Sequence, residues 1–440
     1  MKSPEVFTRS RGAPDGTTGP REKPWAPPAP SVRPVPARSA APRETAEACP
    51  AGAVAPHDVT APSDRLFALD VLRGVAVLLV LVWHWPGRSG SMGPFFVISK
   101  VGWVGVDLFF VLSGFLISGL LYKEWDRCGR LNLRRFWLRR GFKIWPAYFA
   151  AFGAAMLLRS AVLWHEQGGA AVLAYFRRYL PNFLLVQNYY PDVRHWPYTW
   201  SVAVEEHFYL ALPLLLLALA WMRRRRGAGA DRATSSRSPF GYLPLVALFV
   251  CVAALAMRLM AAARGATWDE VHFPTHLRAD SLLFGVLVGY YHHYRGPVFE
   301  RVCNYWPLLL ALVPAALVLP AAYYLKKYPV TYTVGFTLLY LGSGALVALA
   351  AVYPGFGRSK APMRWLATAG RYSYTIYLAH GAMQMLPLYG HAMLRADAVA
   401  GLWGRRALFV GLALAWGVLL AWLVERPALR LRDRLLPARG

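Results

Sequence analysis

The sequence predicts an all-α, polytopic integral membrane protein, a helical bundle with about ten transmembrane helices. Of its 440 residues, 56% are hydrophobic and only 16% are charged, and the mean hydropathy is +0.32. Long apolar runs recur along the chain, several of them inside windows of about 20 residues, the length that crosses the hydrocarbon core of a bilayer. A soluble enzyme of this size could bury a large core without so many such runs.

The first 64 residues differ from the rest in composition. Residues 1–64 are rich in Pro, Ala, Arg and Ser and show no apolar periodicity. Such a segment buries too little apolar surface to offset the entropy cost of ordering, so we expect a disordered cytoplasmic tail. It has no signal-peptide-like apolar stretch, and a later start codon is an alternative because nothing before about Arg65 is needed for a fold. The membrane domain is expected over residues 65–440.

Ten apolar segments are predicted to span the membrane. The stretch 171–190 is apolar but interrupted by arginines, a proline and an asparagine, so we expect it to be interfacial or re-entrant. The weakest apolar patterns among the ten are those of the sixth and ninth segments. The predicted spans are 66–86, 102–122, 143–163, 202–222, 240–262, 279–294, 305–325, 332–353, 370–392 and 404–424.

Basic residues gather in alternate connections between these spans. They cluster in 123–142, in 223–239, in the loop that holds Arg358, Lys360 and Arg364, and in the C-terminal tail. With ten spans, all four clusters and the N-terminus fall on one side, which the positive-inside rule makes cytoplasmic. We therefore expect a multi-pass protein of the cell membrane (the bacterial inner or plasma membrane), with both termini in the cytoplasm.

The net charge of +26 has a membrane explanation. The arginines and lysines lie in short clusters between apolar spans, where they suit anionic lipid headgroups. We therefore expect membrane lipids as partners and no nucleic acid. The four cysteines are scattered without paired spacing, so neither a disulfide framework nor a metal site is predicted.

Ionisable residues inside apolar segments mark candidate sites, because charges are costly in the bilayer. The first span contains Asp70, Arg73 and His84. Arg73 and His84 lie eleven residues apart, close to three helical turns, so they share one face about 16 Å apart. Asp70 precedes Arg73 by one turn and can neutralise it. The alternative is that Asp70 and Arg73 reach the cytoplasmic interface and His84 only ends the helix.

Further ionisable residues recur in later spans. Asp107 lies in a segment with Gly105, Ser113 and Gly114, whose small side chains predict close helix packing around a polar centre. Glu205, Glu206 and His207 open the fourth span, where carboxylates also suit a helix N-terminus. Two adjacent glutamates point about 100° apart, so at least one should face the bundle interior. Arg278 and Asp280 open the sixth span, and His380 lies inside the ninth.

These residues divide between the two halves of the predicted bilayer. Arg73, Arg140 and Lys143 fall toward the cytoplasm, whereas the acid and base groups from His84 to Asp280 fall toward the opposite side. This division suits a reaction whose anionic donor arrives from the cytoplasm. Histidine and glutamate are candidates for proton transfer, since burial can bring either toward neutral pKa. The residues alone predict a multi-span protein with a buried acid/base site.

At these positions the sequence resembles the acyltransferase-3 family of membrane O-acyltransferases, from about Arg65 to Pro427. Six motifs occur in the family's order, so chance is a poor explanation. They are Arg73-Gly74 with His84; Gly105-Val106-Asp107 with FFVLSGFLIS; Arg140, Lys143 and Pro146; Trp200-Ser201 with Val204, Glu205, Glu206, Phe208 and Tyr209; Arg278 and Asp280 with LLFG; and Ser373–Tyr374 through His380, followed by Glu425–Pro427.

Two residues depart from the family pattern. Lys143 replaces the second arginine of an Arg-x-x-Arg pair, which keeps the charge but loses bidentate phosphate geometry. His207 replaces the glutamine that follows the paired glutamates, so it could add a second titrating base. No esterase-like domain follows the last predicted span, so the chain is similar to the stand-alone form of the family.

The resemblance implies transfer of an acyl group, commonly acetyl, from acyl-CoA to a hydroxyl of a sugar, cell-envelope glycan or secreted small molecule. No permanently bound cofactor is expected, since acyl-CoA is a donor substrate. His84 is the predicted general base, oriented by Glu205 or Glu206, between which the sequence does not decide; His207 and His380 are rivals. Arg140 and Lys143 would bind the donor phosphates, with Arg73 on the path of the acyl group. Predicted substrate contacts are Asp107, Trp200, Ser201, Arg278, Asp280 and His380.

A transporter or exporter of small solutes is the alternative function. Transporters also place charges within about ten spans, but they usually show paired repeats with broken helices in matching halves. No such symmetry is evident in this sequence. The enzyme is therefore the preferred interpretation.

Overall fold

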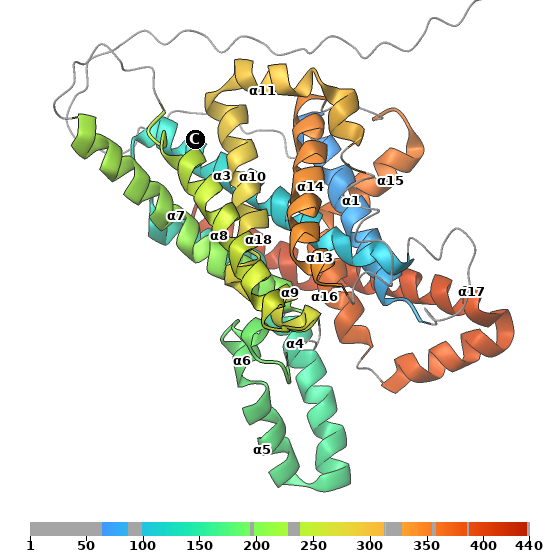
Figure 1. The fold of residues 1–440 in the computed structure, drawn as a ribbon. Coiled ribbons are helices and arrows are strands. Elements are labelled where there is room, and N and C mark those ends of the chain that lie inside the picture. Colours follow the sequence, from blue (N-terminus) through green and yellow to red (C-terminus); the bar gives the residue numbers. More distant parts are fainter. Residues whose placement is uncertain are drawn as a thin grey trace, which may run out of the picture. The chain divides into compact units, whose positions relative to one another are not determined.

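The computed structural model describes residues 64–86, 99–193, 198–227, 238–311, 313, 328–353, 358–384 and 387–437. Within these ranges all regular secondary structure is helical, which confirms the predicted all-α class (Figure 1). The predicted disordered tail lies outside the described residues. So does most of the seventh predicted span.

Long helices form most of the described fold. They are α1 (Asp64–His84), α3 (Gly105–Cys128), α4 (Leu133–Gln167), α7 (Trp200–Gly227), α8 (Leu243–Ala263), α10 (Ala279–Tyr294), α14 (Val334–Val352) and α17 (Pro387–Leu420), which bends at Gly401. Shorter helices connect them: α5 (Gly169–Arg178), α6 (Leu180–Phe183), α9 (Trp268–His272), α11 (Gly296–Cys303), α13 (Pro329–Tyr332), α15 (Ala361–Arg371), α16 (Ser373–Met383) and α18 (Arg426–Leu435).

Seven described segments are long and apolar enough to cross a membrane. They correspond to the first five, the eighth and the tenth predicted spans. The sixth span forms a helix over the predicted range, Ala279–Tyr294, but with 16 residues it is short for a full crossing. The ninth range is divided between the end of α15, the short helix α16 and the start of α17. The ten-span topology therefore stays a prediction. The segment 171–190 forms short helices, and its interfacial or re-entrant placement stays a prediction as well.

Glycines allow the helices around the centre to approach closely. A Cβ atom on Gly114 of α3 would lie 1.9 Å from the Leu282 carbonyl oxygen of α10, and one on Gly370 of α15 would lie 1.8 Å from the Asp70 carbonyl oxygen of α1. Neither backbone can move aside without separating two helices. The predicted close packing around Gly114 is confirmed, and the α1–α15 contact fixes the turn of α1 that carries Arg73.

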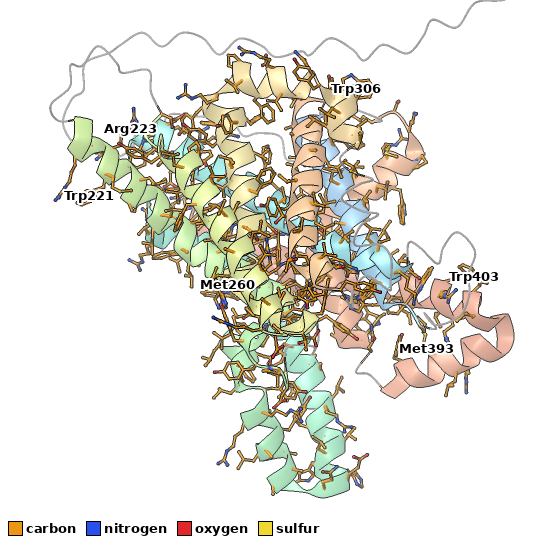
Figure 2. The ribbon with its side chains drawn as sticks, in the orientation of Figure 1. Trp221, Arg223, Met260, Trp306, Met393 and Trp403 are labelled. Carbon is orange, nitrogen blue, oxygen red and sulfur yellow. The ribbon has the colours of Figure 1, made fainter. Side chains whose placement is uncertain are left out.

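The outer surface of the bundle is apolar, as expected of helices that face lipid. On α8, Leu245 is 66% exposed and Phe249 is 72% exposed, and Met260 projects outward from the same helix (Figure 2). In water such a continuous apolar surface would favour aggregation. The lipid-facing helices and the seven apolar segments establish a membrane protein.

Candidate active site

A cavity lies inside the bundle between α1, α3, α4, α7, α15 and α16. It contains about 920 Å³ of space not filled by atoms, open solvent included. One side is apolar and contributed mainly by α3, and the other carries cations, hydroxyls and one carboxylate. Its polar lining residues are Arg73, Arg140, Lys143, Arg371, Ser113, Ser201, Ser373, Glu205, Tyr209, Tyr374 and Tyr377.

The polar wall of this cavity is a linked set of side chains. The Glu205 carboxylate accepts hydrogen bonds from Tyr209 at 2.6 Å and from Ser113 at 3.2 Å. The Arg140 guanidinium lies over the Tyr209 ring, 5.0 Å from its centroid. Arg73 is 3.5 Å from Asp70, the neutralising pair that their spacing predicted. The cavity thus combines positive charge with one partly buried carboxylate.

A second, more basic cavity adjoins the first. This basic vestibule is formed by the ends of α3 and α4 together with α18, and it shares Arg140 and Lys143 with the inner cavity. The two residues predicted to bind donor phosphates therefore lie where the cavities meet. The vestibule's basic residues are Lys123, Arg127, Arg130, Arg135, Arg139, Arg140, Lys143 and Arg432.

Tyr377 lies between the inner cavity and a cluster of aromatic rings. Its hydroxyl donates to the Tyr198 carbonyl at 2.5 Å and is 2.7 Å from the Ser201 hydroxyl. The Tyr198 ring centroid is 4.2 Å from that of His84 and 5.6 Å from that of His380. Tyr198 has a φ of 67°, a left-handed conformation that costs a non-glycine residue about 1–3 kcal/mol. Its carbonyl contact with Tyr377 helps to hold it there.

His84 and His380 lie side by side with 4.9 Å between ring centroids. Nδ1 of His84 is 2.9 Å from the Val80 carbonyl, and Nδ1 of His380 contacts the Tyr377 carbonyl. Because a carbonyl only accepts, each Nδ1 must carry the hydrogen, which in a neutral ring leaves the Nε2 lone pair as the base. The fully buried His380 Nε2 has no hydrogen-bond partner among the described residues.

The predicted carboxylate orientation of His84 differs from the structure. Glu205 bonds to Tyr209 and Ser113, and Glu206 accepts from the Trp145 indole at 3.1 Å. A backbone carbonyl, that of Val80, holds His84 Nδ1 in place of either glutamate. This arrangement is intrinsic to the helix, since residues i and i+4 lie one turn apart. Of the two glutamates, only Glu205 lines the inner cavity.

Three of the predicted substrate contacts form buried ion pairs. Asp107 is 2.5 Å from Arg278, and Asp280 is 2.8 Å from Arg258, with all four side chains fully buried. Arg258 also donates to the Leu277 carbonyl at 2.9 Å. Neither of the cavities above includes these residues. Opposite charges so placed neutralise one another and join α3, α8 and α10, although Asp107 Oδ2 and Arg278 Nε and Nη1 have no hydrogen-bond partner among the described residues.

The other predicted site residues lie either at the inner cavity or in other parts of the bundle. Ser201 lines the inner cavity. Trp200 is buried with its ring centroid 4.5 Å from that of His272. His207 Nδ1 is 2.7 Å from the Thr275 hydroxyl. No pattern in the sequence marked Arg371, Tyr198 or Tyr377 as site residues. Tyr377 lies within the SYTIYLAH motif, so the sequence indicated its neighbourhood but not its role.

Comparison with known proteins supports the family resemblance. A family model described as an acyltransferase domain, acyltransferase-3, matches residues 66–426. The chain is 28% identical over 336 residues to the peptidoglycan O-acetyltransferase of Listeria monocytogenes, covering 71% of this chain and 48% of that protein. It is 27% identical over 364 residues to a putative peptidoglycan O-acetyltransferase of Bacillus subtilis, covering 74% of this chain and 51% of that protein.

A shorter match covers part of the same region. Over 230 residues the chain is 28% identical to a putative O-acetyltransferase of Staphylococcus aureus, covering 50% of this chain and 34% of that protein. The chain thus spans about half the length, or less, of these relatives. No solved structure matches. Because the family match extends over residues 66–426, most of the sequence, the chain belongs to the acyltransferase-3 family of membrane acyltransferases.

Proposed function

We propose that the protein is an O-acetyltransferase that moves an acetyl group from acetyl-CoA to a hydroxyl of a cell-envelope glycan. The main support for this proposal is that two cavities and the histidine pair follow one another along one path. A basic vestibule meets an inner cavity at Arg140 and Lys143, and Tyr377 and Ser201 separate that cavity from the paired imidazoles of His84 and His380. The glycan acceptor is supported by the relatives from Listeria and Bacillus, a peptidoglycan O-acetyltransferase and a putative one.

Each part of this path has a chemical task. Arg140 and Lys143 neutralise the donor phosphates, because charge-assisted hydrogen bonds to phosphate are strong. The inner cavity takes the pantetheine arm, with Arg73 and Arg371 near its polar wall and α3 side chains on its apolar wall. The acetyl thioester then reaches the Tyr377 end of the cavity. Acyl-CoA is consumed as a substrate in this scheme.

At the histidine pair, the acceptor hydroxyl attacks the thioester carbonyl. His84 Nε2 removes the hydroxyl proton as the new oxygen–carbon bond forms. The carbon–sulfur bond breaks, and the CoA thiolate takes the proton from the imidazolium, which restores the neutral ring. The Val80 carbonyl fixes the tautomer throughout, a task that a carboxylate performs in many other enzymes.

Labelled acetyl-CoA tests this function. Sealed membrane vesicles containing the protein are supplied with [¹⁴C]acetyl-CoA on the vestibule side and with glycan fragments on the other. Label in an alkali-labile ester of the glycan is expected, and vesicles carrying His84→Ala serve as the matched control. Solute flux without any acylated product would instead support the transporter alternative and contradict the proposal.

A further inference from the structure

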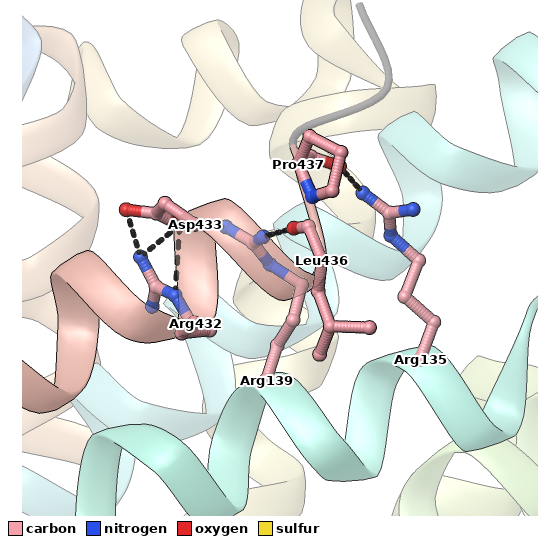
Figure 3. Close-up of polar contacts among 6 residues, drawn as sticks. All are labelled: Arg135, Arg139, Arg432, Asp433, Leu436 and Pro437. Atoms are coloured by element: carbon pink, nitrogen blue, oxygen red, sulfur yellow. Dashed lines mark hydrogen bonds and ion pairs between the residues drawn. The ribbon is translucent and has the colours of Figure 1, made fainter.

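One face of α4 is covered by the C-terminal segment of the chain. Arg135, Arg139 and Lys143 occur at intervals of four residues, so they lie on one face of that helix. The Arg135 guanidinium contacts the Pro437 carbonyl, and that of Arg139 contacts the Leu436 carbonyl (Figure 3). Lys143 pairs with Glu425. Three cations on this face of α4 are therefore in contact with oxygen atoms from residues 425–437.

Local geometry brings this segment onto α4. The turn Ala421–Glu425 is π-helical, an irregularity that often occurs at functional sites. It leaves the Glu425 side chain buried beside Lys143, and α18 continues along the same face. Asp433 of α18 then lies 3.2 Å from Arg139 and 2.8 Å from Arg432 (Figure 3). Residues 425–437 are called the C-terminal strap below.

The cations under the strap also line the basic vestibule. Eight basic side chains line it, against one carboxylate, that of Glu124. Such a surplus of positive charge favours a polyanion. Two of the strap's contacts are to neutral carbonyls, which are weaker partners for arginine than phosphate oxygens are. Asp433 is 53% exposed, and exposed ion pairs contribute little to the free energy of folding. The strap is therefore held by contacts that a phosphorylated ligand can replace.

We propose that the C-terminal strap competes with the phosphate groups of the donor for Arg135 and Arg139, so that donor binding displaces residues 433–437. Buried Glu425 remains beside Lys143 as the hinge at the junction of the two cavities, and the other N–H donors of the Lys143 ammonium stay available to a donor phosphate. The identity of the donor rests on the proposed function. The competition itself requires only that the vestibule binds a polyanion.

The test measures ligand binding to the full chain in lipid nanodiscs. The ligands are CoA and inorganic pyrophosphate. A variant that ends at Arg432 should bind both about threefold to tenfold more tightly, the range expected from releasing one or two weak polar contacts. Asp433→Asn, which keeps the strap's length, should tighten binding in the same direction by a smaller factor. Glu166→Gln removes one negative charge at the far end of α4 and should leave both affinities unchanged.

A mutant cycle makes the test specific. Arg139→Gln should weaken pyrophosphate binding, and truncation in that background should gain less affinity than in the wild type. The proposed competition is wrong if truncation leaves ligand binding unchanged or weakens it and Asp433→Asn binds both ligands with wild-type affinity. Failure of pyrophosphate to bind either form would overturn it too. If truncation tightens pyrophosphate binding while CoA binds neither form, the competition by the strap is confirmed. The assignment of CoA as the donor in the proposed function is then wrong.

Discussion

The hydroxyl of Ser201 donates to that of Tyr377 across 2.7 Å, because the Tyr377 hydroxyl itself donates to the Tyr198 carbonyl. This direction follows from the carbonyl, which can only accept. Both side chains line the inner cavity, and the Tyr377 ring centroid is 5.4 Å from that of His380. The pair thus forms the partition between the proposed donor cavity and the histidines.

Loss of this partition should impair transfer more than folding. Tyr377→Phe keeps the ring but removes the hydroxyl that holds the Tyr198 carbonyl, at a stability cost of about 1–3 kcal/mol. Because Tyr198 packs on both imidazoles, we expect acyl transfer to fall about tenfold or more. Ser201→Ala, which leaves the Tyr377–Tyr198 bond in place, should have a smaller effect. Transfer rates at matched membrane levels, with thermal melting as control, would show the opposite order if this assignment is wrong.

Arg140 should contribute to donor affinity. It lines both cavities and lies over Tyr209, and it forms no ion pair with a described residue. Removing one charge-assisted contact costs about 1.5–3 kcal/mol, so Arg140→Ala should raise KM for acetyl-CoA about tenfold to hundredfold at nearly constant kcat. Arg140→Lys should recover part of the affinity. A loss confined to kcat would place Arg140 in the chemical step.

The Asp107–Arg278 pair distinguishes a structural role from substrate binding. Breaking a buried ion pair leaves an uncompensated charge and costs about 3–5 kcal/mol. Arg278→Met and Asp107→Leu should therefore each lower the melting temperature and the amount of folded protein. The double variant should recover much of that loss, because two apolar side chains need no partner. A double variant that is stable but cannot bind acceptor would support the substrate contacts predicted from the sequence.

Much of the local structure could be predicted from the sequence. Hydropathy located α10 at residues 279–294, and the small residues around Gly114 indicated a close helix contact. Their positions in or beside apolar spans singled out Arg73, Arg140 and Lys143, which the inner cavity brings together. The bounds of α10 and the residue types at these positions could be predicted because each depends on the pattern within one helix. Asp70 and Arg73 pair for the same reason.

Contacts between helices could not be predicted in this way. Arg258 stands in an apolar segment without a visible partner, yet it pairs with Asp280 of another helix. The sequence offered two glutamates for His84, whereas in the structure its Nδ1 donates to the Val80 carbonyl of its own helix. Choosing among such partners requires distances between helices. The basic stripe of α4 likewise gave no sign that residues 425–437 cover it.

The loops that carry basic clusters should all be cytoplasmic. The structure places three of them at one end of the bundle: Arg127 and Arg432 line the same vestibule, and Arg224 donates to the Gly129 carbonyl at 3.1 Å. The positive-inside rule then orients that end. Cysteines introduced at Arg127, Arg225 and Arg430 should resist an impermeant thiol reagent in intact cells and react after permeabilisation. Labelling of any of the three from outside would invalidate both the topology and the cytoplasmic donor.

His84 is the predicted general base, and its replacement should chiefly reduce kcat. Its Nδ1 is committed to the Val80 carbonyl, which leaves Nε2 to accept a proton. General-base catalysis typically contributes about 10²- to 10⁴-fold, so His84→Ala should lose that factor with folding intact. His84→Gln tests hydrogen bonding without basicity and should recover little.

His380 and His207 are the competing candidates, and their surroundings predict different outcomes. His380 is fully buried beside His84, so His380→Ala should reduce transfer by disturbing the ring cluster, and His380→Gln should restore part of it. His207 bonds to Thr275, away from the imidazole pair, so His207→Ala should change kcat little. The deciding measurement is single-turnover acyl transfer by all three alanine variants at matched membrane levels. Near-normal turnover by His84→Ala, with loss in His380→Ala that glutamine does not restore, would move the base from His84 to His380.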